Sequence, residues 1–570
     1  YGWDFMDEGV AWLWLGSPEG PEAEPSWQWL GGQVGADLNM ATMAGDVNAD
    51  GYADVLVASH SYTDVHSSEG KVWLFLGSSS GLSSTSAWSA RGGQDVAFFG
   101  VSIAAAGDVN GNGYDDVIVG ASRFDGGQID EGCAYLYYGS PTGLNGTPAW
   151  THQSNQADAL YGSSVAGAGD VNGDGYADLI VGSYKYETGE LEEGRAELFF
   201  GSNLGPSTSP DWAIDGNAEE EYMGYRVATA GDVNGDGYAD VLVTAGRLYT
   251  DINQDRGEVH LFLGSWSGLS TDPVWICDGD LLNADYGWAL STAGDVNGDG
   301  YSDILVGAPN YSSSLHLGKV FVYHGAPDGP KEAAGWVTES NQTDAAYGIS
   351  VAYAGDVDGD GRTDVLVGAT GYDNGQVDEG AAFLFLGTAQ GLSAIPAWWA
   401  ESNQTDSSFG RCVASAGDVN GDGLDDVVIG APRYDDSYTD EGAAFLWMSA
   451  PGGIPYGNPT NADWTRFGGQ EGAQLGWSVS TAGNVNGDDY SDLIVGAYLY
   501  DNGQSNEGAA WVFHGSATGL STTPNWFRDS AQSSAYFGVS VAHAGDFNGD
   551  GYSDVIVGAS RFTSGQSLEG

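Results

Sequence analysis

Short apolar runs and glycine-rich polar turns alternate along the whole chain. Runs such as Asp116–Ser122 and Cys133–Gly139 are rich in β-branched or aromatic residues, and Gly, Asp and Asn cluster between them. Short runs of this composition between turn residues are typical of β-strands. No stretch keeps the 3.6-residue apolar period of an amphipathic helix. The pattern therefore predicts an all-β protein with almost no helix.

The pattern repeats with a period of about 62 residues. Each copy has four strand-like segments and one acidic loop between the first two of them. The nine loops begin 61 to 66 residues apart, at Asp46, Asp108, Asp170, Asp232, Asp295, Asp356, Asp418, Asn484 and Asp546. Copies that follow one another without a linker indicate a repeat architecture, in which each unit packs against its neighbours.

The acidic loop has the spacing of a calcium-binding loop. In the fourth copy, oxygen-bearing side chains stand at loop positions 1, 3, 5 and 9 (Asp232, Asn234, Asp236 and Asp240), and Gly237 stands at position 6. Alternate residues of a tight loop point inward, and the glycine allows the positive φ that turns the chain around an ion. The first half matches the start of an EF-hand loop, but an Asp at position 9 replaces the distant Glu. Since the flanking residues read as strands, we expect the loop to lie in a β-hairpin.

The same positions supply candidate Ca²⁺ ligands in all nine loops. These residues are Asp46, Asn48, Asp50, Asp54, Asp108, Asn110, Asn112, Asp116, Asp170, Asn172, Asp174, Asp178, Asp232, Asn234, Asp236, Asp240, Asp295, Asn297, Asp299, Asp303, Asp356, Asp358, Asp360, Asp364, Asp418, Asn420, Asp422, Asp426, Asn484, Asn486, Asp488, Asp492, Asp546, Asn548, Asp550 and Asp554. The sixth loop has the most carboxylates, so we expect it to bind tightly. In the eighth, Asn484 replaces the first Asp and Asp489 replaces the glycine, so whether this loop binds an ion is left open.

Landmarks on both sides of the loop resemble a known repeat. An aromatic-glycine pair such as Phe99-Gly100 precedes the loop, and Gly-Ala-Pro follows it at Gly307–Pro309 and Gly430–Pro432. This order resembles the FG-GAP repeat of the integrin α-subunit N-terminal domain, and the resemblance covers essentially the whole chain. It implies a β-propeller of four-stranded antiparallel blades, with calcium held in the hairpin that joins the first two strands.

The two ends of the chain complement each other. The Glu-Gly landmark at Gly9 recurs at Gly570, which is 561 residues or nine periods later. The C-terminus therefore stops after two strands of the ninth unit, and the missing two are expected at 10–15 and 26–30. We predict one nine-bladed propeller over 1–570, with the ninth blade shared between about 1–31 and 533–570 and the ring closed by pairing of the terminal strands. Trp27 or Trp29 would then take the place of the repeated tryptophan. The alternative is an open or polymerising chain, or part of a longer array.

Composition narrows the range of partners. The formal net charge is −63 and the chain has only 16 Lys and Arg residues. Because nucleic-acid binding depends on basic side chains that neutralise phosphates, we expect no nucleic-acid partner. No apolar run approaches the roughly 18 residues of a membrane helix. The three cysteines have neither a metal-binding spacing nor that of a disulfide framework. Extracellular calcium modules work at about 10⁻⁴–10⁻³ M, so we expect a secreted or cell-surface protein.

The repeat offers little support for catalysis. The eight histidines lie at unmatched repeat positions and form no HExxH motif. We therefore expect a non-enzymatic adhesion or assembly module whose partner is a surface or matrix protein, a glycan or a copy of itself. The alternative is a lectin or a polysaccharide-degrading enzyme, for which the tryptophan in each unit would be an exposed sugar contact. We interpret that tryptophan instead as a wedge between neighbouring units. It recurs as Trp88, Trp150, Trp212, Trp275, Trp336, Trp398, Trp464 and Trp526.

Overall fold

The computed structural model describes residues 10–13, 25–30, 33, 38, 40–245, 258–278, 286, 288–311, 315–327, 329–330, 333–450, 453–454, 457–546 and 551–559. Strands dominate this part of the chain, and its helical residues form one 3-10 turn, η1 (Pro459–Asn461). The predicted all-β class is confirmed. No helix among the described residues has the length and apolar character needed to cross a membrane.

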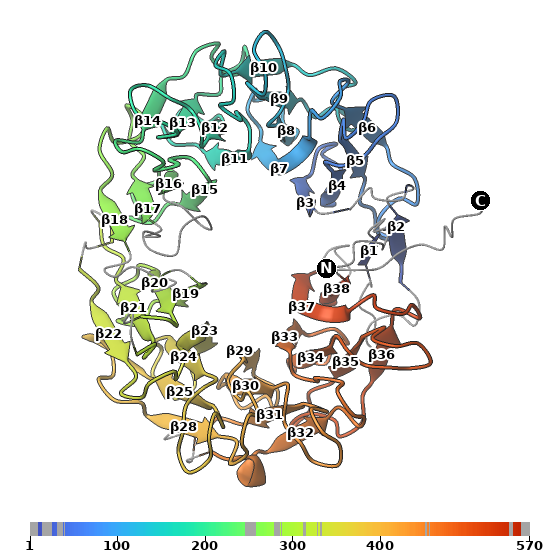
Figure 1. Cartoon of the computed structure of the whole chain (residues 1–570), viewed down its shortest axis with the longest axis vertical. Coiled ribbons are helices and arrows are strands. Elements are labelled where there is room, and N and C mark those ends of the chain that lie inside the picture. The colour runs from blue at the N-terminus through green and yellow to red at the C-terminus, as the bar shows by residue number, and fades with distance from the viewer. Residues whose placement is uncertain are drawn as a thin grey trace.

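Eight four-stranded antiparallel sheets stand as blades around a central opening (Figure 1). In each blade the strands follow chain order from the opening to the outer edge. The innermost strands are β3 (Met40–Gly45), β7 (Phe99–Gly107), β11 (Ser164–Gly169), β15 (Val227–Gly231), β19 (Ala289–Gly294), β23 (Tyr347–Gly355), β29 (Cys412–Gly417) and β33 (Ser478–Gly483). The second strands are β4 (Asp54–Ser59), β8 (Asp116–Ala121), β12 (Asp178–Ser183), β16 (Asp240–Ala245), β20 (Asp303–Ala308), β24 (Asp364–Ala369), β30 (Asp426–Ala431) and β34 (Asp492–Ala497).

The outer half of each blade is equally regular. The third strands are β5 (Lys71–Phe75), β9 (Cys133–Tyr137), β13 (Arg195–Phe199), β17 (Glu258–Phe262), β21 (Lys319–Tyr323), β25 (Ala381–Phe385), β31 (Ala443–Trp447) and β35 (Ala509–Phe513). The outermost are β6 (Trp88–Arg91), β10 (Trp150–Gln153), β14 (Trp212–Asp215), β18 (Trp275–Asp278), β22 (Trp336–Glu339), β28 (Trp398–Glu401), β32 (Trp464–Phe467) and β36 (Trp526–Asp529). Two-residue strands β26 (Gly387–Thr388) and β27 (Gly391–Leu392) add a small turn before β28.

The second strand of each blade forms its core. All six residues of β8, β12 and β24 are buried, because both faces of a blade are covered by neighbouring blades and a β-branched run suits such a strand. The first hairpin ends in a register shift immediately before the acidic loop, for example between Thr229 and Gly231. This bulge and the positive φ of Gly231, 69°, direct the chain into the loop.

One tryptophan per blade packs against the next blade. Trp88 meets the ring of Tyr137 edge-on, with centroids 4.7 Å apart, and its Nε1 donates to the carbonyl oxygen of Asn145 at 2.9 Å. The same edge-on contact recurs around the ring. A buried aromatic ring contributes about 150–250 Å² of contact area. The interpretation of the repeated tryptophan as a wedge between blades is confirmed.

The first and the last described strands of the chain lie near each other. Strands β1 (Val10–Leu13) and β2 (Trp27–Leu30) pair with each other, as do β37 (Phe537–Gly545) and β38 (Asp554–Ala559). β1 lies next to β38, where the ends of the ring meet (Figure 1). No hydrogen-bonded ladder joins them among the described residues. The continuous ninth blade, shared between about 1–31 and 533–570, and the single propeller over 1–570 therefore remain predictions.

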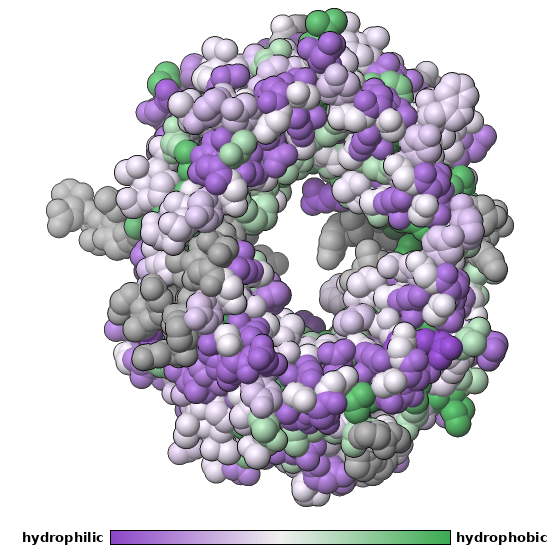
Figure 2. Space-filling model, turned by 180° about the vertical axis from the view of Figure 1, so that it is seen from behind, coloured by the Kyte–Doolittle hydropathy of each residue, from purple (hydrophilic) through white to green (hydrophobic). Residues whose placement is uncertain are grey.

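Trp27 takes the wedge position predicted for one of the N-terminal tryptophans. Its ring meets Phe75 of the first blade edge-on at 4.9 Å, and its Nε1 donates to the carbonyl oxygen of Ser83 at 2.9 Å. The β1–β2 pair thus packs against the first blade as every other outer strand packs against its neighbour. Figure 2 shows that the central opening remains in the space-filling view and that hydrophilic residues cover most of this face.

Candidate metal sites

The acidic loops join the first two strands of each blade. In the fourth loop, Asp232 follows β15, and its two carboxylate oxygens accept the N–H groups of Asp236 at 3.0 Å and Gly237 at 2.8 Å. Asn234 Oδ1 accepts the N–H of Asp236 at 3.1 Å. Gly237 has a φ of 91°, a conformation that glycine adopts without strain. These bonds turn the side chains at positions 1 and 3 into the loop, and the same bonds recur in the third, fifth, sixth and seventh loops.

The Asp at position 9 is buried at the start of the second strand. Asp240 is 0 % exposed; one carboxylate oxygen accepts the N–H of Val233 and the other that of Gly264, both at 2.8 Å. Burial raises the pKa of Asp240 to about 6 and that of Asp364 to about 7, although the two backbone hydrogen bonds lower it. No Lys or Arg pairs with either residue in the described part of the chain. A carboxylate buried in this way is destabilised when ionised and would be stabilised by a cation.

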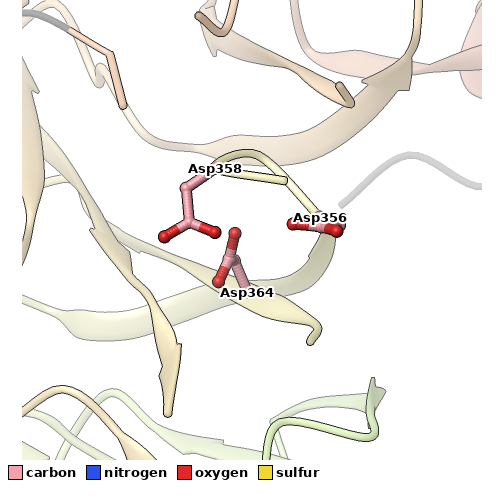
Figure 3. Close-up of side chains that lie close together, drawn as sticks. All are labelled: Asp356, Asp358 and Asp364. Carbon is pink, nitrogen blue, oxygen red and sulfur yellow. The ribbon is translucent and has the colours of Figure 1, made fainter. Parts of the chain in front are cut away.

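The sixth loop brings three carboxylates together. Ligand oxygens of Asp356, Asp358 and Asp364 lie within 4.8 Å of one another, and Figure 3 shows them converging. An all-oxygen group of this kind fits a hard divalent cation. Asp360, also predicted as a ligand, instead accepts hydrogen bonds from the backbone N–H of Arg362 at 2.9 Å and from its guanidinium at 2.7 Å. Asp360 thus lies in the loop but outside the group of three.

The eighth loop keeps the fold of the others despite its substitutions. Asn484 Oδ1 accepts the N–H of Asp488 at 3.0 Å, as an Asp would. Asp489, in the place of the turn glycine, has a φ of 73°. A Cβ at this position meets nothing within 4 Å in the loops that carry glycine there, so the cost is confined to the backbone.

The remaining predicted ligands occupy the same hairpin in their own blades. In the ninth loop, Asn548 and Asp550 lie outside the described residues.

Sequence reasoning missed the acid at loop position 8, because it points toward the preceding loop rather than its own. Asp425 Oδ2 accepts the N–H of Asp356 at 3.0 Å. The Asp-Asp pairs 115–116 and 425–426 were the available signal.

Two family models match the chain. The model described as FG-GAP repeat matches residues 286–323, 412–447, 475–513 and 537–568. The model described as FG-GAP-like repeat matches residues 46–119, 108–181, 170–243 and 356–429. Together they cover most of the chain and all nine acidic loops.

Similar proteins are known from animals. Integrin alpha-PS2 of Drosophila melanogaster is 34% identical over 241 residues, which are 38% of this chain and 16% of that protein. Integrin alpha-8 of Homo sapiens is 31% identical over 224 residues, 38% of this chain and 20% of the integrin. Phosphatidylinositol-glycan-specific phospholipase D of Bos taurus is 35% identical over 214 residues, 35% of this chain and 25% of the phospholipase. The matches thus span at most a quarter of these relatives' length.

Proposed function

The chain belongs to the FG-GAP repeat family, and on that premise we propose that it is a calcium-binding propeller that works outside the cell as a non-enzymatic adhesion or interaction module. The observation that supports this most is the buried acid at loop position 9. Asp54, Asp240 and Asp364 are almost fully shielded from water beside other acids. Seven of these buried acids have a pKa raised to about 6 or 7, which a bound cation would relieve.

The residues at positions 1, 3, 5 and 9 would hold Ca²⁺, which neutralises their charges and takes six to eight oxygen ligands. Asp356, Asp358 and Asp364 have the geometry nearest to such a site. In the eighth loop Asn484 offers one carbonyl oxygen where the other loops offer a carboxylate. We therefore propose eight calcium sites, with the eighth loop the weakest candidate for a ninth.

Thermal unfolding with and without a chelator tests the calcium proposal. Free Ca²⁺ at about 100 times its dissociation constant stabilises by roughly 2.7 kcal/mol per site. The protein in 2 mM Ca²⁺ is expected to melt well above the same protein in EDTA, and Mg²⁺, which demands tighter octahedral geometry, is expected to restore less. An identical melting temperature in Ca²⁺ and EDTA would refute calcium binding.

The formal net charge of −63 and the integrin relatives support the interaction role. We propose a protein or glycan of a cell surface or matrix, or a second copy of this chain, as the partner. Binding to a glycan array and to a panel of immobilised matrix proteins, each with and without calcium, is the direct experiment. Calcium-dependent capture by at least one class supports the role, and binding that ignores calcium argues against a calcium-organised surface.

A second candidate is a polysaccharide-binding lectin or a polysaccharide-degrading enzyme. Trp266 favours a lectin, because its side chain is 81% exposed at the turn between β17 and β18, unlike the wedge tryptophans. The phospholipase relative shows that such repeats also occur in a protein named for an enzymatic activity. A lyase and hydrolase screen separates the candidates, since turnover of any polysaccharide would overturn the non-enzymatic role.

A further inference from the structure

The acidic loops of neighbouring blades are hydrogen-bonded to one another. The backbone N–H at position 8 of one loop donates to the carbonyl oxygen at position 1 of the loop before it, as Ser491 donates to Asp418 at 2.9 Å. The same bond joins the first loop to the second, the second to the third, the third to the fourth, the fifth to the sixth, the sixth to the seventh and the eighth to the ninth. Position 1 is a candidate ligand and position 8 adjoins another, so each bond connects two cation sites.

Side chains add a second bond at four of these junctions. Asp425 accepts the N–H of Asp356 at 3.0 Å, and Asp115 accepts the N–H of the first loop's Asp46 at 2.8 Å. At two other junctions the hydroxyl groups of Thr363 and Ser553 take the same place, at 3.1 Å each. A carboxylate and a hydroxyl both serve, so the side chain acts here as a hydrogen-bond acceptor rather than as a charge. Ala177 and Ala239 hold the position in the third and fourth loops, where the backbone bond alone joins the neighbouring loops.

The junction between the fourth and fifth loops is different. Asp232 and Ser302 hold the equivalent positions, and among the described residues no bond joins them. A cavity of about 560 Å³ lies there, lined by Asp232, Val233 and Gly235 of the fourth loop and by Tyr301 and Ser302 of the fifth. The network therefore divides into one run from the first to the fourth loop and another from the fifth to the ninth.

We propose that calcium binds cooperatively within each run and independently across the seam between the fourth and fifth loops. This inference rests on the proposed calcium function. An ion that orders one loop fixes the backbone to which the next is bonded, so the next ion meets a loop that is already partly ordered. Such coupling is reciprocal between the two sites. Asp425 is then a positioning residue, which links the sixth and seventh sites without binding an ion itself.

Calorimetric calcium titration of the full chain, with hydrogen exchange of the loop segments, tests the coupling. The native protein is expected to bind with a Hill coefficient above 1, and the sixth and seventh loops should become protected together. In Asp425→Ala the N–H of Asp356 loses its acceptor. Calcium affinity of the sixth loop should then fall about three- to tenfold, as for one lost hydrogen bond of ordinary strength. The coupling between the two loops should weaken to that of the junctions at Ala177 and Ala239, which keep the backbone bond alone.

Matched variants separate the effect of the lost hydrogen bond from the effects of a lost charge and of misfolding. Asp425→Ser keeps an acceptor, as Ser553 does, and is expected to behave like the native chain. Glu471→Ala removes an exposed carboxylate away from the loops, and this variant is also expected to behave like the native chain. If Asp425→Ala fails to fold, Asp115→Ala makes the same test between the first and second loops. Coupling of native strength in both Ala variants would overturn the role of position 8 in linking the sites. The same loss of calcium affinity and coupling in Asp425→Ser as in Asp425→Ala would also overturn it.

The seam has its own test. Asp232→Ala in the fourth loop should leave the calcium-dependent protection of the fifth loop unchanged, whereas Asp418→Ala in the seventh should weaken that of the sixth. A shift in the fifth loop in Asp232→Ala would overturn the seam. Calcium binding to independent sites in the native chain would overturn the coupling alone, while a complete absence of calcium binding would refute the proposed function itself.

Discussion

At the scale of single residues, the acid at loop position 9 carries the largest electrostatic cost. Asp364 is 1% exposed at the start of β24, and the nearby Asp358 and Asp356 raise its pKa further. Its two backbone hydrogen bonds offset only part of the desolvation. Such an arrangement is unfavourable in the empty loop and favourable once a divalent cation is bound, which makes calcium part of the folding energetics.

The pH dependence of stability should reveal these acids. Burial raises the pKa of Asp364 from its ordinary value of 3.8 to about 7, so between these values the folded state binds more protons than the unfolded chain. The free energy of unfolding then falls with rising pH. In EDTA, stability is expected to decrease from about pH 4 to about pH 7 and to level off above, whereas saturating calcium flattens the decrease. Urea unfolding across this range is the measurement, and stability that rises with pH in EDTA would contradict it.

Loss of a ligand should depend on which loop loses it. Asp236→Ala or Asp358→Ala is expected to cost about 2–3 kcal/mol when calcium is near 100 times its dissociation constant, as for one lost site. Asn484→Ala should cost less than about 1 kcal/mol, as for one hydrogen bond. Chemical denaturation in calcium compares the three variants. Equal costs would mean that the eighth loop is occupied like the others.

At the scale of elements, each blade depends on the next. The outer strand of a blade is only four residues long, as in β10, and its first residue is a tryptophan that packs across the blade boundary. Trp150 is buried against Phe199 at 4.9 Å and donates its Nε1 to the carbonyl oxygen of Ser207 at 3.0 Å. Neighbour contacts of this kind give repeat proteins much of their stability.

Truncation of the wedge should therefore be costly. Trp150→Ala is expected to lower the free energy of unfolding by about 3–5 kcal/mol, since it leaves a cavity and an unpaired carbonyl. Trp266→Ala is the matched control, because that side chain is 81% exposed, and it should change stability by no more than about 0.5 kcal/mol. Denaturant unfolding monitored by circular dichroism measures both. A comparable effect of the two substitutions would contradict the wedge role.

At the scale of the whole molecule, the ring depends on its ends. The β1–β2 pair packs on the first blade through Trp27 and lies beside β38. An unpaired strand edge invites association with other chains. Pairing of β1 with β38 would join residues more than 500 positions apart and remove that edge within one molecule.

Removal of residues 1–30 tests this closure. The truncated chain is expected to form oligomers or to unfold at a lower temperature, because β38 and the first blade lose their cover. Light scattering and thermal melting of both chains measure the effect. A truncated chain that stays monomeric and equally stable would show that the ends do not meet, and concentration-dependent polymers of the intact chain would indicate strand exchange between molecules.

The sequence alone determined the strands, the period and the chemistry of the loops, because these depend on local properties. β-branched runs, Asp-x-Asn-x-Asp-Gly turns and a tryptophan in each repeat specify strands, tight loops and wedges within a few residues of each position. Only the tertiary structure decided what crosses between blades. The bond from Asp356 to Asp425 joins residues 69 positions apart, the burial of Asp364 depends on the strands around it, and the cavity between the fourth and fifth loops is lined by residues of two blades. No local pattern encodes how two blades meet, because their contact involves residues far apart in the sequence.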